Sequence, residues 1–183
     1  ISIDPVLTWW GARAEYWLRP HPGTDCCIAL AWLNVIMEED LIDHEFVENW
    51  CAYYDELKEY VEPFTPEWAG KICDLDPELI RDSARFYAAA ERAAIQWGLA
   101  FDQNTNGMQA GQCVLAMICM CGNLDVPGGL TVGAPNSFMG KWRMDSRQFV
   151  AEEDWAQRIG AEQYPALAYT HATTHPDVTL DVL

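Results

Sequence analysis

The chain has 183 residues, half of them hydrophobic, which is enough to form one domain or parts of two around a sizeable core. Its formal net charge of −17 makes nucleic acid and anionic membrane surfaces unlikely partners, because phosphates would be repelled. No apolar run is long enough to span a membrane, and the odd count of 7 Cys without a C-x-x-C spacing predicts reduced, buried thiols instead of a disulfide framework or zinc ribbon.

The N-terminal elements are predicted to be short. Residues 1–3 read as the end of a β-strand stopped by Asp4-Pro5, and residues 9–16 as a short helix. A second short strand over 17–19 precedes a turn at Pro20 to Gly23. Thr24 or Asp25 then begins a helix that runs to about Glu38.

Helices dominate the middle of the chain. Asp43 is expected to cap one helix, and residues 56–61 to form another. Thr65-Pro66-Glu67 and Asp76-Pro77-Glu78 each combine a cap, Pro at the first helical position and an acid in the first turn, and the second helix should reach about Arg92.

The later elements return to the strand–helix pattern. Residues 93–97 are predicted to form a buried strand, 98–107 a polar loop, and 107–121 an apolar helix that should be enclosed. A helix over 152–159 and a loop-like tail follow. The order predicts an α/β fold, helix-rich, with a few short and mostly parallel strands, as in an incomplete Rossmann-like dinucleotide-binding unit.

Two turns that contain Asp are the candidate binding residues. Asp4 lies at a strand end, and Gly23, Thr24 and Asp25 offer backbone N–H groups, a hydroxyl and a carboxylate at a helix start. Such groups suit a nucleotide. The local pattern alone nevertheless favours an ordinary turn and helix cap.

The order of several motifs resembles the molybdopterin oxidoreductases of the dimethyl-sulfoxide-reductase family. The resemblance rests on Ile3-Asp4-Pro5, Pro22-Gly23-Thr24-Asp25, the run Glu38 to Asp43 with Phe46-Val47, Thr65 to Ala69, Trp97-Gly98 with Gln103, and Gly122-Asn123 followed by Pro127-Gly128-Gly129. It covers residues 1–130 closely and the tail loosely. With Trp9, Ala94 to Trp97 and Asp125 to Gly129, the chain looks most like the acetylene-hydratase-like branch.

The resemblance implies a set of cofactor-binding residues and no catalytic or metal-ligating ones. Asp4 and Pro5 would line the guanosine end of a molybdopterin guanine dinucleotide, and Gly23, Thr24 and Asp25 would hold its guanine. Trp97, Gly98 and Gln103 would contact the cofactor from the second unit. Two arginines of the family pattern are replaced here by Val6 and His21, so a cationic contact is lost or supplied elsewhere.

The resemblance also implies a domain organisation. Residues 1–92 would be the later part of a dinucleotide-binding domain, 93–135 a strand–loop–helix of the adjoining cofactor-binding domain, and 136–183 an irregular tail packed on the rest of the enzyme. The family's iron–sulfur Cys cluster and metal ligand are not found in this sequence. The chain is therefore expected to be an inactive internal fragment of a molybdenum or tungsten bis-molybdopterin-guanine-dinucleotide enzyme.

Partners follow from that expectation. They would be the other domains of the parent enzyme and its electron-transfer partner, with no nucleic acid and no membrane insertion. The cellular compartment stays open. The alternative is a stand-alone helical interaction module whose 9 Trp mark a partner-binding face.

Two patterns in the sequence resemble metal sites but do not predict one. His171 and His175 have the spacing of a zinc pair on a helix, but no third ligand is evident. The acidic runs 38–40 and 152–154 lack the alternating oxygen ligands and Gly of a calcium loop, so solvated helix ends explain them.

Overall fold

A computed structural model describes residues 1–132 and 151–157 of the chain. Residues 1–132 form one compact unit, and the short helix α8 (Glu152–Ala156) lies in a separate unit of residues 133–183. The elements of the first unit are β1 (Ser2–Ile3), the 3₁₀ turn η1 (Gly11–Arg13), β2 (Trp17–Leu18), α1 (Asp25–Glu38), α2 (His44–Trp50), α3 (Tyr54–Val61), α4 (Pro66–Cys73), α5 (Pro77–Ala88), α6 (Leu99–Asp102) and α7 (Gly107–Met120).

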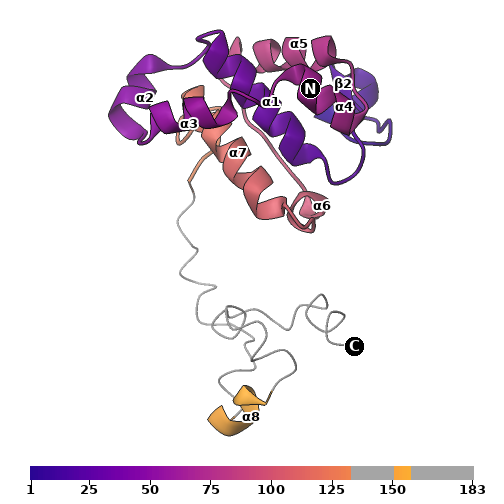
Figure 1. The fold of residues 1–183 in the computed structure, drawn as a ribbon, viewed down its shortest axis with the longest axis vertical. Coiled ribbons are helices and arrows are strands. Elements are labelled where there is room, and N and C mark those ends of the chain that lie inside the picture. Colours follow the sequence, from indigo (N-terminus) through magenta and orange to yellow (C-terminus); the bar gives the residue numbers. More distant parts are fainter. Residues whose placement is uncertain (133–150, 158–183) are drawn as a thin grey trace. The chain divides into compact units, whose positions relative to one another are not determined.

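Helix α1 is the centre of this unit. It is buried at almost every position from Ile28 to Met37, and α3, α4, α5 and α7 pack around it (Figure 1). Its sequence explains the placement, because its charged residues stand only at its two ends, Asp25 and Glu38. A helix that is apolar all round is stable only when it is enclosed.

The two short strands pair in parallel, as the sequence predicts. Ser2 pairs with Trp17 and Ile3 with Leu18. The side chain of Leu18 is completely buried, which anchors the pair to the core. The helix-rich α/β class with few parallel strands is confirmed.

Three predicted helix caps are present. The side chains of Asp43, Thr65 and Asp76 accept hydrogen bonds from backbone N–H groups in the first turns of α2, α4 and α5. Each cap satisfies a donor that the helix itself leaves free. Thr24 differs, because it occupies the N-cap position of α1 without a side-chain cap hydrogen bond.

Several predicted elements are wrong in detail. Residues 9–16 contain only η1, and α5 ends at Ala88 instead of Arg92. Residues 93–98 run without regular structure where a strand was expected, and α6 occupies part of the expected polar loop. A strand needs a hydrogen-bonded neighbour, and within the described residues the only sheet is the β1–β2 pair.

Helix α7 is covered on one side only, although its sequence predicts an enclosed helix. Val114, Met117 and Ile118 are buried, but the side chain of Met108 is 78% exposed and that of Leu115 is 43% exposed. Its neighbours within the described unit are chiefly α1, α2 and α6. No helix among the described residues is both long and apolar enough to cross a membrane.

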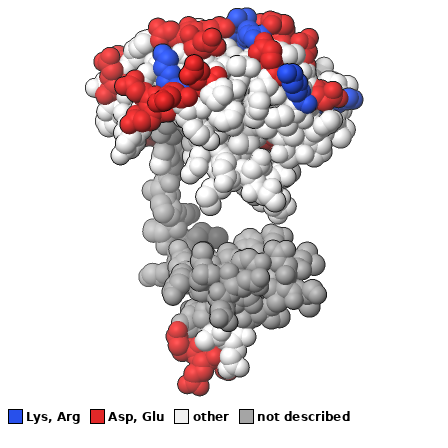
Figure 2. All heavy atoms as spheres, viewed as in Figure 1, with Lys and Arg blue, Asp and Glu red and all other residues white. Residues whose placement is uncertain are grey.

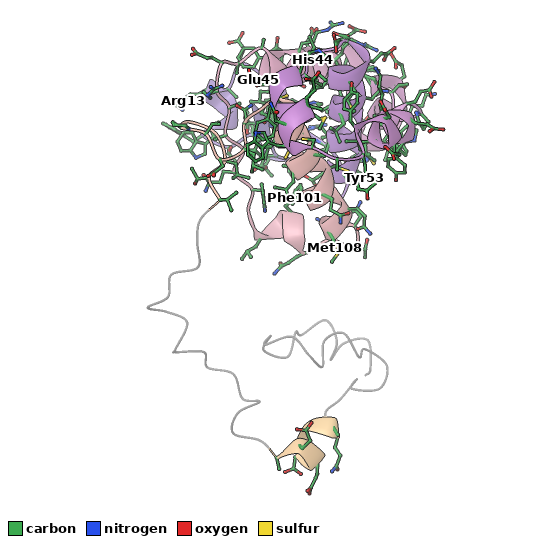
Figure 3. The ribbon with its side chains drawn as sticks, turned by 90° about the vertical axis from the view of Figure 1, so that its left-hand side faces the viewer. Arg13, His44, Glu45, Tyr53, Phe101 and Met108 are labelled. Carbon is green, nitrogen blue, oxygen red and sulfur yellow. The ribbon has the colours of Figure 1, made fainter. Side chains whose placement is uncertain are left out.

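Charge is unevenly distributed over the surface of the 1–132 unit. In Figure 2 the acidic and basic side chains gather over the part built from α2 to α5, and the surface around α6 and α7 is almost free of them. The sequence accounts for this, since residues 93–124 contain a single charged residue, Asp102. Figure 3 shows Phe101 and Met108 at this end, away from His44 and Glu45.

Candidate functional site

A cavity of about 850 Å³ lies between the end of β1, the turn before α1, the end of α5 and the segment 93–98. Most of the residues singled out from the sequence line it: Asp4, Pro5, Gly23, Asp25, Trp97, Gly98 and Gln103. Residues separated by almost a hundred positions in the chain therefore meet at one place. Thr24 is the one predicted site residue outside the lining.

Asp4 is held at the cavity by the strand pair. Its backbone N–H donates to the carbonyl of Leu18 at 3.1 Å, and its carbonyl accepts from Nε1 of Trp17 at 2.9 Å. Its Oδ1 accepts from the backbone N–H of Val6 at 2.8 Å. Among the described residues no hydrogen bond reaches Oδ2, so one carboxylate oxygen of this half-buried residue can accept from a ligand.

The turn before α1 positions Asp25. Gly23 has a φ of +83°, which a residue with a side chain adopts only with strain, and the N–H of Thr24 donates to the carbonyl of His21 at 3.2 Å. His21 is itself tied to the end of α4, through its N–H and the carbonyl of Cys73 at 3.1 Å. Asp25 follows as the first residue of α1, half-buried, at the positive end of the helix dipole.

Thr24 contributes its side chain to the turn before α1. Its hydroxyl donates to the carbonyl of His21 at 2.7 Å, inside the turn. This bond closes the turn on its side-chain side. Within the described structure Thr24 therefore shapes the site without lining it.

The connection between α6 and α7 reaches back to the same turn. Nδ2 of Asn106 donates to the carbonyl of Gly23 at 3.4 Å, and a Cβ atom built on Gly23 would stand 3.3 Å from Oδ1 of Asn104. Asn104 and Gln96 also line the cavity. Sequence reasoning treated 98–107 only as a polar loop. The closely spaced pair Asn104 and Asn106 was the feature of the sequence that could have indicated a contact between this loop and the cavity.

The segment 93–98 is held in place by the end of α7. Oδ1 of Asn123, a residue only 1% exposed, accepts from the N–H of Ala93 at 3.1 Å. Backbone bonds between Asn123 and Leu130 and between Asp125 and Leu130 close the loop behind it. The Gly122-Asn123 and Pro127-Gly128-Gly129 motifs are therefore structural in this unit.

The charged groups in the described cavity lining are all acidic. Its lining includes two carboxylates, Asp4 and Asp25, and contains no Lys, Arg or His among the described residues. Much of the remaining lining is apolar and includes Ile28, Val114 and Met117. Such a surface suits a flat ring that carries several N–H or hydroxyl donors, and it does not suit a phosphate.

An aromatic pair supports the apolar wall. Trp32 and Tyr87 both line the cavity, with ring centroids 5.7 Å apart, and both are more than nine-tenths buried. Nε1 of Trp32 has no hydrogen-bond partner among the described residues. Burial raises the pKa of Tyr87, so its hydroxyl stays protonated at neutral pH.

Among the described residues, no group of three or more His, Cys, Asp or Glu side chains is placed to hold a metal ion. His171 and His175 lie outside the described residues. The acidic run 38–40 is used in ion pairs, because Glu39 binds Arg85 and Asp40 faces His44.

The chain is similar to several characterised enzymes, although no family model matches it. It is 37% identical to the alpha subunit of F420-dependent formate dehydrogenase from Methanocaldococcus jannaschii, over 85% of this chain and 25% of that protein. It is 35% identical to acetylene hydratase from Syntrophotalea acetylenica, over 93% of this chain and 23% of that protein.

A more distant relative and a solved structure agree with these two. Dimethyl sulfoxide/trimethylamine N-oxide reductase from Cereibacter sphaeroides is 32% identical over 70% of this chain and 16% of its own length. The structure of acetylene hydratase from Pelobacter acetylenicus superposes with a TM-score of 0.74 at 32% identity, covering 90% of this chain and 23% of that one. The chain thus spans between 16% and 25% of the length of these relatives.

Proposed function

Because the chain belongs to the molybdopterin oxidoreductase (dimethyl-sulfoxide-reductase) family, we propose that its cavity holds the guanosine end of a molybdopterin guanine dinucleotide. The parent would be a molybdenum or tungsten enzyme that carries two such pterins. It would catalyse a two-electron oxidoreduction, or a hydration if the likeness to acetylene hydratase extends to activity. The described chain would bind cofactor and perform no chemistry alone.

One observation carries this proposal. The predicted residues were chosen from turns and motifs at two distant parts of the sequence, yet seven of the eight line the same cavity. A set of ordinary turns and caps would have no reason to converge around a hollow of this size. The volume, about 850 Å³, lies in the range of small-molecule sites.

The donor set fits the guanosine end. The carboxylate of Asp25 would accept from the ring N–H and the amino group of guanine, and Asp4 would accept from ribose hydroxyls. Gly23 allows the backbone to approach the ligand, and Trp97 offers an aromatic face from the other wall. The described lining offers no cation for the pyrophosphate, whose charges would be met outside it.

The bound group would supply the redox or Lewis-acid chemistry of the enzyme, and these residues would bind and orient its far end. An iron–sulfur cluster, the metal ligand, the remaining domains and an electron-transfer partner belong to the same proposal. All of them would lie in other parts of the enzyme.

A change of base specificity tests the role of Asp25. Asp25→Asn exchanges an acceptor for a donor, so binding of GMP should weaken about 10- to 100-fold, as expected for loss of a charge-assisted bond. XMP has a carbonyl where GMP has the amino group, so the same variant should bind XMP more tightly than the original chain does. Calorimetric titration of both nucleotides measures the exchange.

A matched control separates this effect from a general change in charge. Asp55 is exposed in the first turn of α3, away from the cavity lining, and Asp55→Asn should leave both affinities unchanged. If Asp25→Asn folds normally and its preference for GMP over XMP is that of the original chain, Asp25 does not read the base.

The alternative of a Trp-rich interaction module receives less support. Trp9 and Trp10 are exposed next to the strand pair, and Trp50 is exposed at the end of α2. These two places lie at opposite ends of the 1–132 unit (Figure 1). Trp32 is buried in the core, so the described tryptophans do not form one partner-binding face.

A further inference from the structure

Phe86 is a large apolar side chain on the otherwise charged surface of α5. The buried positions of this helix are Ile80, Ser83, Ala84 and Tyr87. Phe86 is 48% exposed, whereas the other exposed positions of the helix carry charged residues: Glu78, Asp82 and Arg85. Phe86 also belongs to the lining of the cavity. Its ring is therefore available to a ligand that the cavity holds.

A second aromatic ring supports Phe86. The ring of Tyr16 packs against it in a tilted arrangement, with centroids 5.2 Å apart, and Tyr16 is not part of the cavity lining. The carbonyl of Tyr16 accepts from the N–H of Ser2 at 2.8 Å, so the contact places Phe86 beside the start of β1. A ring that is already held on one side offers a ligand a flat surface at little cost in side-chain entropy.

Helix α1 gives a scale for the length of the cavity. Four of its residues line the cavity, at the spacing of one helix face: Asp25, Ile28, Ala29 and Trp32. At a rise of about 1.5 Å per residue, the first and last of them lie about 10 Å apart along the helix. The ring of Trp32 is 5.7 Å from that of Tyr87, the neighbour of Phe86 in the chain. Asp25 and Phe86 therefore stand at opposite ends of this row.

Strand β1 shows the same order independently. Ile1, Ile3 and Asp4 line the cavity, and the start of the strand lies beside Phe86 through the bond between Ser2 and Tyr16. Asp4 follows the last residue of the strand. Along both α1 and β1, the carboxylate is thus at the end away from Phe86. The cavity has an acidic end and an apolar, aromatic end.

We propose that Phe86 stacks on the base that Asp25 reads and makes the site select two-ring bases over one-ring bases. This role rests on the proposed function. The donors of guanine are on its six-membered ring, so its five-membered ring would extend away from Asp25, over Ile28 and Ala29, towards Phe86. A base with one ring would end short of Phe86. Stacking of a base on an aromatic side chain is favourable for any base that reaches it.

Titration of the 183-residue chain with two nucleosides tests this selection. Guanosine and uridine carry the same ribose, both have a ring N–H, and neither has a phosphate that the acidic lining would repel. Phe86→Ala should weaken guanosine binding about 10-fold, as expected for the loss of one stacking contact, and should leave uridine binding unchanged. Calorimetry of both nucleosides gives the change in preference.

Further variants separate stacking from simple packing. Phe86→Leu keeps an apolar side chain against Tyr16 but removes the flat ring, so it should lose the preference for guanosine as Phe86→Ala does. Phe86→Trp restores a flat ring and should keep the preference. Tyr60→Ala is the matched control, because Tyr60 is 62% exposed, packs 5.5 Å from the ring of Phe64 and lies outside the cavity lining. It should change neither affinity.

The outcomes distinguish this role from the proposed function. Urea unfolding first establishes that each variant is folded. If the original chain binds guanosine and folded Phe86→Ala or Phe86→Leu keeps the full preference over uridine, Phe86 does not stack on the base, and the proposed function stands without it. If the original chain does not bind guanosine, the proposed function and this role are both overturned.

Discussion

Gly23 is the residue at which the two walls of the cavity are joined. Its positive φ turns the chain toward Asp25, and its carbonyl accepts the hydrogen bond from Asn106. A Cβ atom at this position would stand 3.3 Å from Oδ1 of Asn104. The conformation of this single residue therefore sets both the approach to α1 and the position of the loop before α7.

Gly23→Ala should destabilise the chain and open the site. The left-handed conformation costs a residue with a Cβ atom about 1–2 kcal/mol, and the new methyl group would press on Asn104. A lower midpoint in urea unfolding and weaker binding of GMP are the expected results.

Gly111→Ala is the matched control for that substitution. Gly111 lies inside α7, and a Cβ atom there would meet nothing within 4 Å. Alanine should raise the free energy of unfolding by about 0.5–1 kcal/mol, because it favours the helix. If both variants stabilise the chain equally, the turn at Gly23 is not strained by a side chain.

At the same scale, the sequence pointed to some residues of the cavity lining and passed over others for a physical reason. Asp4, Gly23 and Asp25 stand in local turns whose chemistry can be read from a few neighbours. Asn104 and Gln96 act through tertiary contacts with segments far away in the chain, which no local pattern records. The hydroxyl of Thr24 shows the same limit, because a hydroxyl can donate as well as accept, and the sequence does not say that here it donates to the carbonyl of His21.

Helices α1 and α5 are linked at the surface by one ion pair between elements. Nε and the Nη2 atom of Arg85 each donate to a carboxylate oxygen of Glu39 at 2.8 Å, in a bidentate arrangement. The hydrogen bonds from Arg85 hold the pKa of Glu39 below its usual value. This pairing fixes the C-terminal end of α1 against the helix that supplies Tyr87 to the cavity.

Glu39→Gln should therefore lower stability in a pH-dependent way. A carboxyl whose pKa is depressed in the folded state stabilises that state above its unfolded pKa, near 4.5, and the contribution disappears as pH falls through the folded value. The urea midpoints of the original chain and the variant should differ at neutral pH and converge in acid. The difference is small, since the pair is largely exposed. A difference that persists below the folded pKa would mean that the charge of Glu39 is not its cause.

Elements were predicted well where the cause of their structure is local. The caps at Asp43, Thr65 and Asp76 each set a helix start, and the structure contains all three. The expected strand over 93–97 depended on a neighbouring strand, and the described unit offers it only the side chain of Asn123. The covering of α7 likewise depends on surroundings that its own apolar pattern cannot specify.

Across the whole molecule, the cavity and the surface have the same sign of charge. The net charge is −17, and the described cavity lining adds two carboxylates without a cation. The general fold class could be predicted because the spacing of apolar residues differs between helices and strands. The convergence of distant turns on one cavity could be expected only through the family resemblance. The division at residues 92 and 135 stays a prediction.

This charge predicts an unusual ranking of ligands. Guanosine should bind more tightly than GMP, and GMP more tightly than GDP, because each phosphate adds repulsion. Raising the salt concentration from about 20 mM to about 0.5 M should shrink the differences by screening. Calorimetry at the two salt concentrations measures both effects. An affinity that rises with each phosphate at low salt would reveal a cationic contact.

The strand pair that holds Asp4 has only two residues on each side, and so small a sheet has little stability of its own. The position of the Asp4 carboxylate therefore depends on the burial of Leu18 in the core, and Asp4 takes this position only when the chain is folded. Ligand binding and folding are then thermodynamically linked, and the ligand concentration itself becomes a variable of stability. A chain weakened anywhere in its core would bind less well, and an occupied site would protect a weakened core.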